Sequence, residues 1–178
     1  TPHPSHFDIT LNALSNKKAV LCEKPMTMNA TQTMILIDAS RKNNTLLMEA
    51  FMYKSHPQTL KVCEILRHSF KPPLTIDAEF CFQVDVPESH RLVNSKLGGG
   101  SILDIGCYPM SISRLAVGMV NGKDFLNPSE IECESELNSQ GVDLNAEANL
   151  TFEDGSTANI KSATNLASES AVTIKDAS

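Results

Sequence analysis

Hydrophobic and polar positions in residues 1–72 follow two alternating periodicities, that of helices and that of short buried strands. Apolar side chains three and four positions apart indicate helices, and short apolar runs bounded by turn residues indicate strands. Ser5 and Asn29 are suitable N-caps for the first two helices. In chain order, the pattern predicts a helix over 6–16, a strand over 19–22, a helix over 29–41, a strand over 45–49 and a helix over 56–68.

The pattern changes after Pro72-Pro73. Longer runs of alternating polarity follow, and an Asp154-Gly155 turn marks a hairpin. The pattern predicts strands over 74–84, 130–137, 142–152, 156–164 and 171–174, an irregular segment over 85–101 and a helix over 102–118. The expected inner stripe of this helix is Leu103, Cys107, Met110 and Leu115, and its expected terminators are Gly118 and Gly122.

These two patterns predict two parts with different folds. The order strand, helix, strand, helix in residues 1–72 is typical of a parallel, doubly wound α/β sheet. Residues 73–178 have the long strands and the hairpin of a mainly antiparallel sheet. We therefore expect an α/β protein whose domain boundary lies between 72 and 73.

Composition narrows the class of protein. Of the 178 residues, 41% are hydrophobic and 20% charged, as in a globular protein, and the net charge of -6 argues against nucleic acid or an anionic membrane as partner. The sequence has no apolar run long enough to span a bilayer. Its five cysteines lack a CxxC pair, so we expect reduced thiols, a cytoplasmic protein and no metal site. The chain starts at Thr1-Pro2 rather than at Met, and we expect it to be a piece of a longer protein.

Two short motifs contain the candidate catalytic chemistry. Glu23-Lys24-Pro25 follows the apolar run of the first strand, and Asp104 and Tyr108 follow Gly98-Gly99-Gly100. A lysine beside a tyrosine suits proton transfer at an alcohol or carbonyl oxygen, because the ammonium lowers the pKa of the phenol. Plainer readings stay open at this point: a surface lysine, a core tyrosine, a helix cap at Asp104 and an ordinary glycine loop.

Further polar residues are candidates for binding an anionic ligand. His6 lies near the start of a helix, where anions are favoured, although it could equally be a surface histidine. Arg91 precedes the glycines and could pair with a phosphate or a substrate oxygen. Glu23 suits a structural role or a ribose contact. The sequence contains no GxGxxG, P-loop, HExxH or GxSxG motif.

Taken together, four segments resemble the Gfo/Idh/MocA oxidoreductase family, and within it the dihydrodiol and D-xylose dehydrogenase branch. They are the run Thr1 to His6, the run Lys18 to Pro25, the run Glu49 to Gln58, and the glycine motif that ends in Asp104-Ile-Gly-Cys-Tyr108. The combination of Glu-Lys-Pro with this glycine motif is fairly specific, and the resemblance covers essentially the whole chain.

The resemblance implies that residues 1–72 are the C-terminal part of a Rossmann domain and that residues 73–178 form an α+β domain with a large, mainly antiparallel open sheet. It implies NADP or NAD as cofactor, hydride transfer at a CH–OH group of a sugar or cyclic trans-diol, and a homodimer. Tyr108 would be the general acid/base, with Lys24 and Asp104 assisting. The implied cofactor-binding residues are Pro2, His6, Glu23, Lys24, Pro25 and Arg91.

The resemblance also places the phosphate-binding glycine motif of the family before Thr1. We therefore expect the isolated chain to expose unpaired sheet edges and to bind cofactor poorly. Two alternatives remain: a non-catalytic dinucleotide-sensing protein on the same fold, and an oxidoreductase that retains its cofactor tightly.

Overall fold

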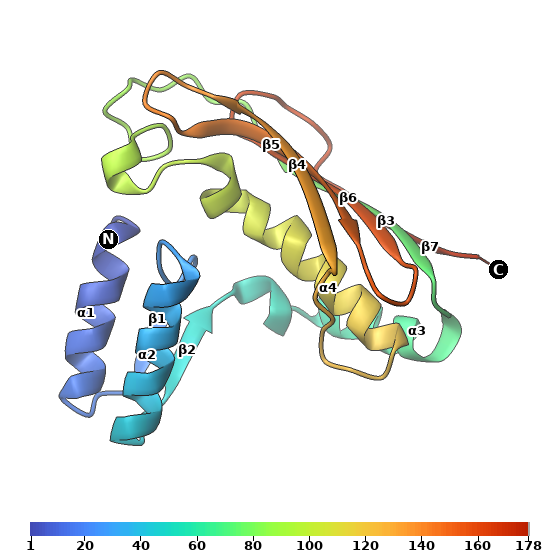
Figure 1. Cartoon of the computed structure of the whole chain (residues 1–178), viewed down its shortest axis with the longest axis horizontal. Helices are drawn as coiled ribbons and strands as arrows, with labels where there is room; N and C mark the ends of the chain where they lie inside the picture. Colours follow the sequence, from blue (N-terminus) through green and yellow to red (C-terminus); the bar gives the residue numbers. More distant parts are fainter. Residues whose placement is uncertain (178) are drawn as a thin grey trace.

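The computed structural model describes residues 1–177 and begins with a small parallel α/β unit. Its strands β1 (Val20–Glu23) and β2 (Leu47–Ala50) pair in parallel, with Leu21 opposite Met48. Helices α1 (Pro4–Ser15) and α2 (Ala30–Asn43) pack against each other and against this strand pair (Figure 1). The short helix η1 (Met52–Ser55) and helix α3 (Pro57–Ser69) lead to the second part.

The second part is built on a five-stranded sheet of order β4-β5-β6-β3-β7. Only the β3–β6 pair is parallel, so the expected mainly antiparallel open sheet is confirmed. Helix α4 (Cys107–Val120) lies along one face of this sheet (Figure 1). The strands are β3 (Leu74–Cys81), β4 (Glu130–Leu137), β5 (Asp143–Thr151), β6 (Thr157–Ala163) and β7 (Val172–Asp176).

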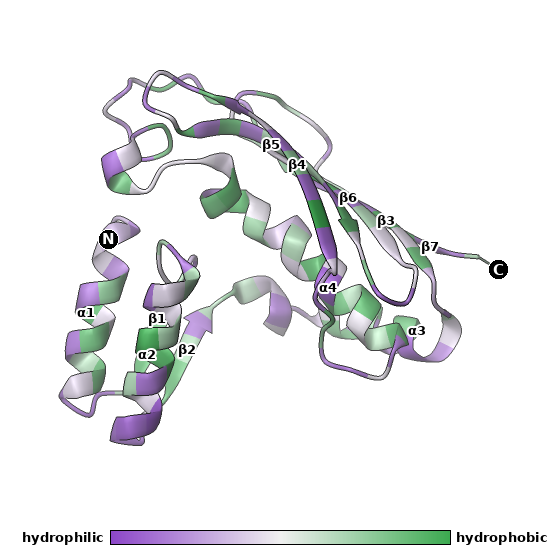
Figure 2. Ribbon diagram, in the orientation of Figure 1, coloured by the Kyte–Doolittle hydropathy of each residue, from purple (hydrophilic) through white to green (hydrophobic). Residues whose placement is uncertain are grey.

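The main hydrophobic core lies between α4 and the sheet. Alternate residues of β3, such as Leu74 and Ile76, are 1% exposed and face the helix, as the period of a half-buried strand requires. Val117 of α4 and Phe152 join the same cluster, and Figure 2 shows apolar residues along α4 beneath the sheet. Leu66 of α3 also belongs to this cluster, because α3 packs against α4 rather than against β1 and β2.

Of the two predicted N-caps, Asn29 is confirmed and Ser5 is wrong. The Asn29 side chain accepts a hydrogen bond from the Gln32 N–H and caps α2, as expected. Asn44 ends this helix in a left-handed conformation. Ser5, however, lies inside α1, which begins at Pro4 with His3 as its N-cap residue. Proline is favoured at the first helical position because an N–H there would have no partner within the helix. The helix therefore starts at Pro4, earlier than predicted.

The predicted helix over 102–118 differs from the structure in its first turn and in its buried face. Residues Ile102–Gly106 form a π-helical turn, η3, and α4 then continues to Val120. The wider turn shifts the helical phase, so Ser113, Ala116 and Val117 are buried. The four residues of the predicted stripe, Leu103, Cys107, Met110 and Leu115, are only half-buried.

Gly118 does not end α4, contrary to the prediction. A Cβ atom there would lie 2.4 Å from Cα of Phe125, so glycine permits close packing of the following segment on the helix. The helix ends at Asn121, and Gly122 follows with a φ of +68°. Among residues 1–177, no helix is long and apolar enough to cross a membrane.

Candidate active site

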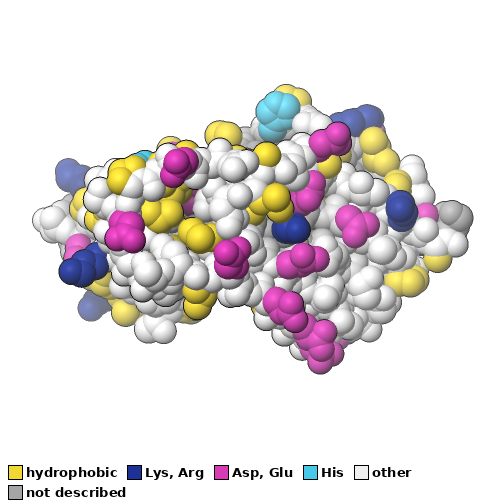
Figure 3. Space-filling view, turned by 90° about the horizontal axis from the view of Figure 1, so that it is seen from above, with side chains coloured by type: hydrophobic (Ala, Val, Ile, Leu, Met, Phe, Trp, Pro, Cys, Tyr) yellow, Lys and Arg dark blue, Asp and Glu magenta, His cyan; other side chains and the backbone are white. Residues whose placement is uncertain are grey.

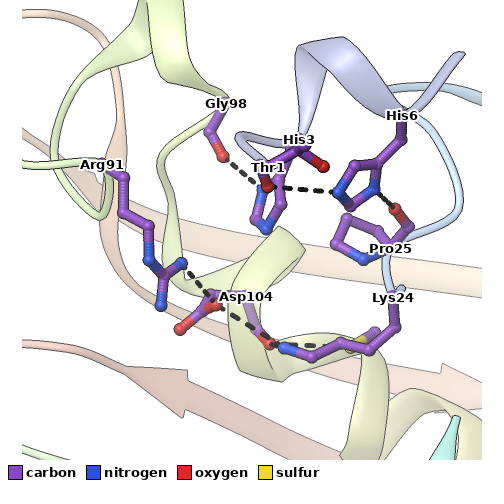
Figure 4. A network of polar contacts seen from close by, with 9 residues as sticks. Thr1, His3, His6, Lys24, Pro25, Arg91, Gly98 and Asp104 are labelled. Atoms are coloured by element: carbon purple, nitrogen blue, oxygen red, sulfur yellow. Dashed lines mark hydrogen bonds and ion pairs between the residues drawn. The ribbon is translucent and has the colours of Figure 1, made fainter. Parts of the chain in front are cut away.

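Lys24 lies directly after β1, at the carboxyl end of the parallel strand pair. Its Nζ donates to the main-chain oxygen of Asp104 and lies 3.5 Å from Oδ1 of the same residue (Figure 4). The Lys24 and Asp104 side chains are 17% and 10% exposed. The structure therefore joins the two predicted motifs at one largely buried ion pair.

The turn that carries Lys24 is fixed by side chains from two other elements. Nδ1 of His6, on α1, lies 2.9 Å from the Pro25 carbonyl oxygen and donates to it. Glu49, at the end of β2, accepts the Met26 N–H at 2.8 Å through Oε1. The Lys24–Pro25 peptide bond is cis. The Pro25–Met26 peptide group is thus held at both its carbonyl and its N–H.

Asp104 is shared by two cations. Arg91 Nη1 lies 3.0 Å from Asp104 Oδ1, the same oxygen that faces Lys24 (Figure 4). The Asp104 carboxylate does not cap the helix, which was the plainer reading of the sequence. Asp143, at the start of β5, does so instead: its Oδ2 accepts the Ile102 N–H at 2.7 Å and the Ser101 hydroxyl at 2.8 Å.

The three glycines before this helix make room for protein atoms rather than for a ligand. The Gly98 carbonyl accepts a hydrogen bond from His3 Nδ1 at 2.9 Å, and a Cβ at Gly98 would lie 2.6 Å from Sδ of Met28. At Gly100, whose φ is +127°, a Cβ would lie 2.2 Å from Oδ1 of Asp143. Close approach at these glycines therefore holds the helix start against its neighbours.

Tyr108 lies half-buried in an aromatic cluster next to Lys24. Its ring packs edge-on against Phe51, Phe80 and Tyr53, at centroid distances of 4.8, 5.4 and 5.8 Å. Lys24 Nζ lies 5.3 Å from the centroid of the same ring. Lys24, Asp104 and Tyr108 are thereby brought together.

The expected effect of Lys24 on the phenol is not found. Burial raises the pKa of Tyr108 above its ordinary value, and the neighbouring Cys107, Glu23 and Asp104 raise it further. The Lys24 ammonium lies over the ring and contacts Asp104, a position from which it does not offset the burial of the phenol.

The remaining predicted binding residues have different surroundings. Pro2 and Glu23 are exposed. His6 is 5% exposed, and its two ring nitrogens face the carbonyl oxygens of Pro25 and Thr1. The Arg91 side chain is 50% exposed and forms an ion pair with Asp104. No group of three or more His, Cys, Asp or Glu side chains within residues 1–177 could hold a metal ion.

Three contributors to the site were missed from the sequence: His3, Glu49 and Asp143. Each acts through a contact with main chain distant in sequence, and no local periodicity or spacing indicates such a contact. The only available signal was the position of His3 and Glu49 inside the runs that carried the family resemblance.

A parallel β-α-β unit with a charged site at its carboxyl edge, joined to an open sheet, defines a two-part α/β protein. The family model described as "Oxidoreductase family, NAD-binding Rossmann fold" matches residues 1–51, and that of the GFO/IDH/MocA C-terminal domain matches residues 72–175. The chain belongs to the Gfo/Idh/MocA oxidoreductase family, an NAD(P)-binding family.

Similar proteins include two dehydrogenases and a reductase. A trans-1,2-dihydrobenzene-1,2-diol dehydrogenase of Xenopus tropicalis is 38% identical over 79% of this chain and 41% of its own length. A D-xylose 1-dehydrogenase (NADP(+)) of Haloferax volcanii is 30% identical over 90% of this chain and 47% of its own length. The chain thus spans about half the length of the curated relatives that it matches.

A 3-ketoreductase from Actinomadura kijaniata, solved in complex with NADP and TDP-benzene, has a similar structure. It superposes with a TM-score of 0.82 at 26% identity, over 99% of this chain and 52% of that chain.

Proposed function

We propose that the whole protein carrying this chain is an NADP-dependent dehydrogenase acting on a CH–OH group of a sugar or of a cyclic trans-diol. The observation that carries the proposal is the meeting of Lys24, Asp104 and Tyr108 from two segments far apart in sequence. An ammonium, a carboxylate and a phenol together suit proton transfer at an alcohol or carbonyl oxygen. The activities for which the two dehydrogenase relatives are named support this choice of substrates.

In this proposal each residue has one role. Tyr108 takes the hydroxyl proton when the alcohol is oxidised and returns it when the carbonyl is reduced. The Lys24 ammonium stabilises negative charge that develops on the reacting oxygen. Asp104 orients the substrate hydroxyl by accepting its hydrogen bond. The nicotinamide, when bound, supplies the carbon that accepts the hydride.

The carboxyl edge of β1 suits the nicotinamide end of NADP or NAD. Ligands of open parallel sheets bind at this edge, where Glu23 is exposed and Lys24 and Pro25 follow. We assign His6 and Arg91 to holding Pro25 and Asp104, respectively, because their side chains already make those contacts. A GxGxxG motif for the pyrophosphate is absent from the 178 residues, so only the nicotinamide end is assigned to them.

Turnover by the whole protein tests the proposal. NADP⁺ reduction is followed by the absorbance of NADPH, with D-xylose and with trans-1,2-dihydrobenzene-1,2-diol as substrates. We expect Tyr108→Phe to lower kcat by about 10²-fold or more, since that is the usual contribution of a general acid/base, with NADP binding unchanged. Full activity of this variant would overturn the assignment of Tyr108. Tight NADP binding without turnover on either substrate would favour the dinucleotide-sensing alternative.

We further propose that the protein is a homodimer formed through the outer face of the five-stranded sheet, and that it works in the cytoplasm. The five cysteines, all free thiols in the structure, suit a reducing compartment.

A further inference from the structure

Glu49 is the only acidic side chain on β2, the strand that pairs with the one preceding Lys24. It stands at the third position of β2, opposite Cys22 of β1, one strand away from the turn. Its Oε1 accepts the Met26 N–H at 2.8 Å, and the bond spans 23 residues of sequence. A carboxylate that accepts a main-chain N–H forms a charge-assisted hydrogen bond, which is stronger than a neutral one.

The turn held by Glu49 decides where the Lys24 ammonium can reach. A lysine side chain is long and flexible, so the position of its Nζ depends on where its backbone is fixed. Here the peptide group between Pro25 and Met26 is held at both ends, its carbonyl by His6 and its N–H by Glu49. From this backbone position the Nζ contacts Asp104 and lies over the Tyr108 ring.

We infer that Glu49 is a positioning residue for catalysis: by fixing the Met26 N–H it keeps the Lys24 ammonium on Asp104 and beside Tyr108. The inference rests on the proposed function, because Glu49 affects catalysis only if Lys24 has its proposed catalytic role. Glu49 itself contacts neither substrate nor cofactor in this assignment.

Variants of the whole protein test this inference through kcat. Glu49→Ala removes the acceptor, and we expect kcat to fall about 10- to 100-fold, the range expected for a catalytic group displaced by about 1 Å, while KM for NADP changes little. Glu49→Gln keeps an amide oxygen at the same position and should retain kcat within about fivefold of the parent.

A double variant separates positioning from a general structural effect. In a Lys24→Ala background, Glu49→Ala should lower kcat less than about twofold further, since its effect passes through Lys24. A fall as large as in the parent would mean that Glu49 acts elsewhere and would overturn the inference. Thr27→Val is the matched control: Thr27 lies two residues after Pro25, is 5% exposed, and its hydroxyl bonds to Asn29 and Thr33. It should leave kcat unchanged.

A readout without turnover distinguishes this inference from the proposed function. Reductive methylation of Lys24, followed by peptide mass spectrometry, measures how firmly its ammonium is held. Glu49→Ala should speed methylation of Lys24 at least about threefold, since a freed ammonium is more accessible, and Glu49→Gln and Thr27→Val should not. An unchanged rate in Glu49→Ala overturns the inference. Faster methylation together with a Lys24→Ala variant of full activity would uphold the positioning of Lys24 and contradict its proposed catalytic role.

Discussion

The surroundings of Tyr108 fix the protonation state of its phenol. Its ring is enclosed by Phe51 and Phe80, and the Lys24 ammonium faces the ring rather than opposing the effect of burial. Burial, followed by the acidic groups nearby, raises the pKa of Tyr108 above 10.0. The phenol is therefore protonated at neutral pH, ready to donate a proton to a carbonyl oxygen.

This protonation state predicts opposite pH dependences for the two directions of the proposed reaction. Oxidation of the alcohol requires the phenolate as base, so kcat for oxidation should rise with pH throughout the range up to about 10. Reduction of the carbonyl requires the phenol as acid, so its kcat should stay level near neutral pH and fall only in alkaline solution. Steady-state rates at a series of pH values check this, with Tyr108→Phe as control. An oxidation rate that levels off near pH 7 would mean that the pKa of Tyr108 is lowered in the working enzyme.

Arg91 offers a second prediction at this scale. Because its guanidinium pairs with Asp104, Arg91→Gln should lower kcat by about two- to fivefold, the modest effect expected of a half-exposed ion pair. KM for NADP should stay the same. A large rise in KM for NADP, with kcat preserved, would instead support the phosphate contact that the sequence suggested. Lys61→Gln, which breaks an exposed ion pair with Glu64, is the matched control.

At the scale of elements, the start of α4 depends on a residue from another strand. Asp143 of β5 caps the π-helical turn η3 through the Ile102 N–H and the Ser101 hydroxyl. The same turn carries Asp104, so the cap also fixes the site. Gly100 makes this possible, since any larger residue there would collide with the Asp143 carboxylate.

Removal of this cap should destabilise the chain and loosen the site. We expect Asp143→Ala to lower the free energy of unfolding by about 1–2 kcal/mol, the usual range for losing a helix cap. Asp143→Asn, which keeps one acceptor oxygen, should lose less than half of this. Urea unfolding of both variants and of the parent gives the comparison. Equal stability of Asp143→Ala and the parent would mean that the cap contributes nothing to folding.

The strands and the start of α4 show which parts of the fold could be predicted from the sequence. The strands could be predicted because alternation is local: Leu74, Ile76 and Ala78 are buried as their spacing indicates. The π turn could not be predicted, because it depends on a cap 41 residues away in sequence. For the same reason, the predicted helical stripe misses the most buried residues of α4, although Met110 and Leu115 still pack against the core.

The residues of the site could be predicted from the sequence, but their arrangement could not. Lys24, Asp104 and Tyr108 could be singled out by residue type and motif, and the structure brings them together. Their mutual orientation could not, because it depends on the packing of two parts of the chain. That packing places Lys24 over the Tyr108 ring, so the direction of the pKa shift differs from expectation. It also gives Arg91 a protein partner, Asp104, that the sequence did not indicate.

At the scale of the whole molecule, two exposed faces differ in character. One face of the β1–β2 pair leaves Leu21 67% and Met48 51% exposed, whereas parallel sheets are usually covered on both faces. The outer face of the five-stranded sheet is polar instead, and Figure 3 shows acidic side chains gathered there. Its charged residues are Asp77, Glu79, Glu130, Glu132, Glu134, Glu136 and Glu147, against Lys161 and Lys175.

This excess of acidic side chains predicts how the proposed homodimer depends on salt. Two copies that meet through this face bring like charges together, and dissolved ions screen that repulsion within about 10 Å at 0.1 M ionic strength. The dimer should therefore become tighter by about two- to tenfold as salt rises from about 0.05 to 0.5 M. Sedimentation velocity of the whole protein over a range of concentrations measures this dissociation constant.

A charge-removing variant identifies the face that is responsible. Glu134 lies opposite Glu147 on the neighbouring strand, and only Glu147 has a cation close by, with Lys161 Nζ at 3.7 Å. Glu134→Gln should thus tighten the dimer at low salt and leave it unchanged at high salt, where the repulsion is already screened. Glu64→Gln, on the exposed side of α3, removes a charge elsewhere and should have no effect. A dimer that weakens as salt rises would require ion pairs between the two copies, and the acidic outer face would then not be the interface.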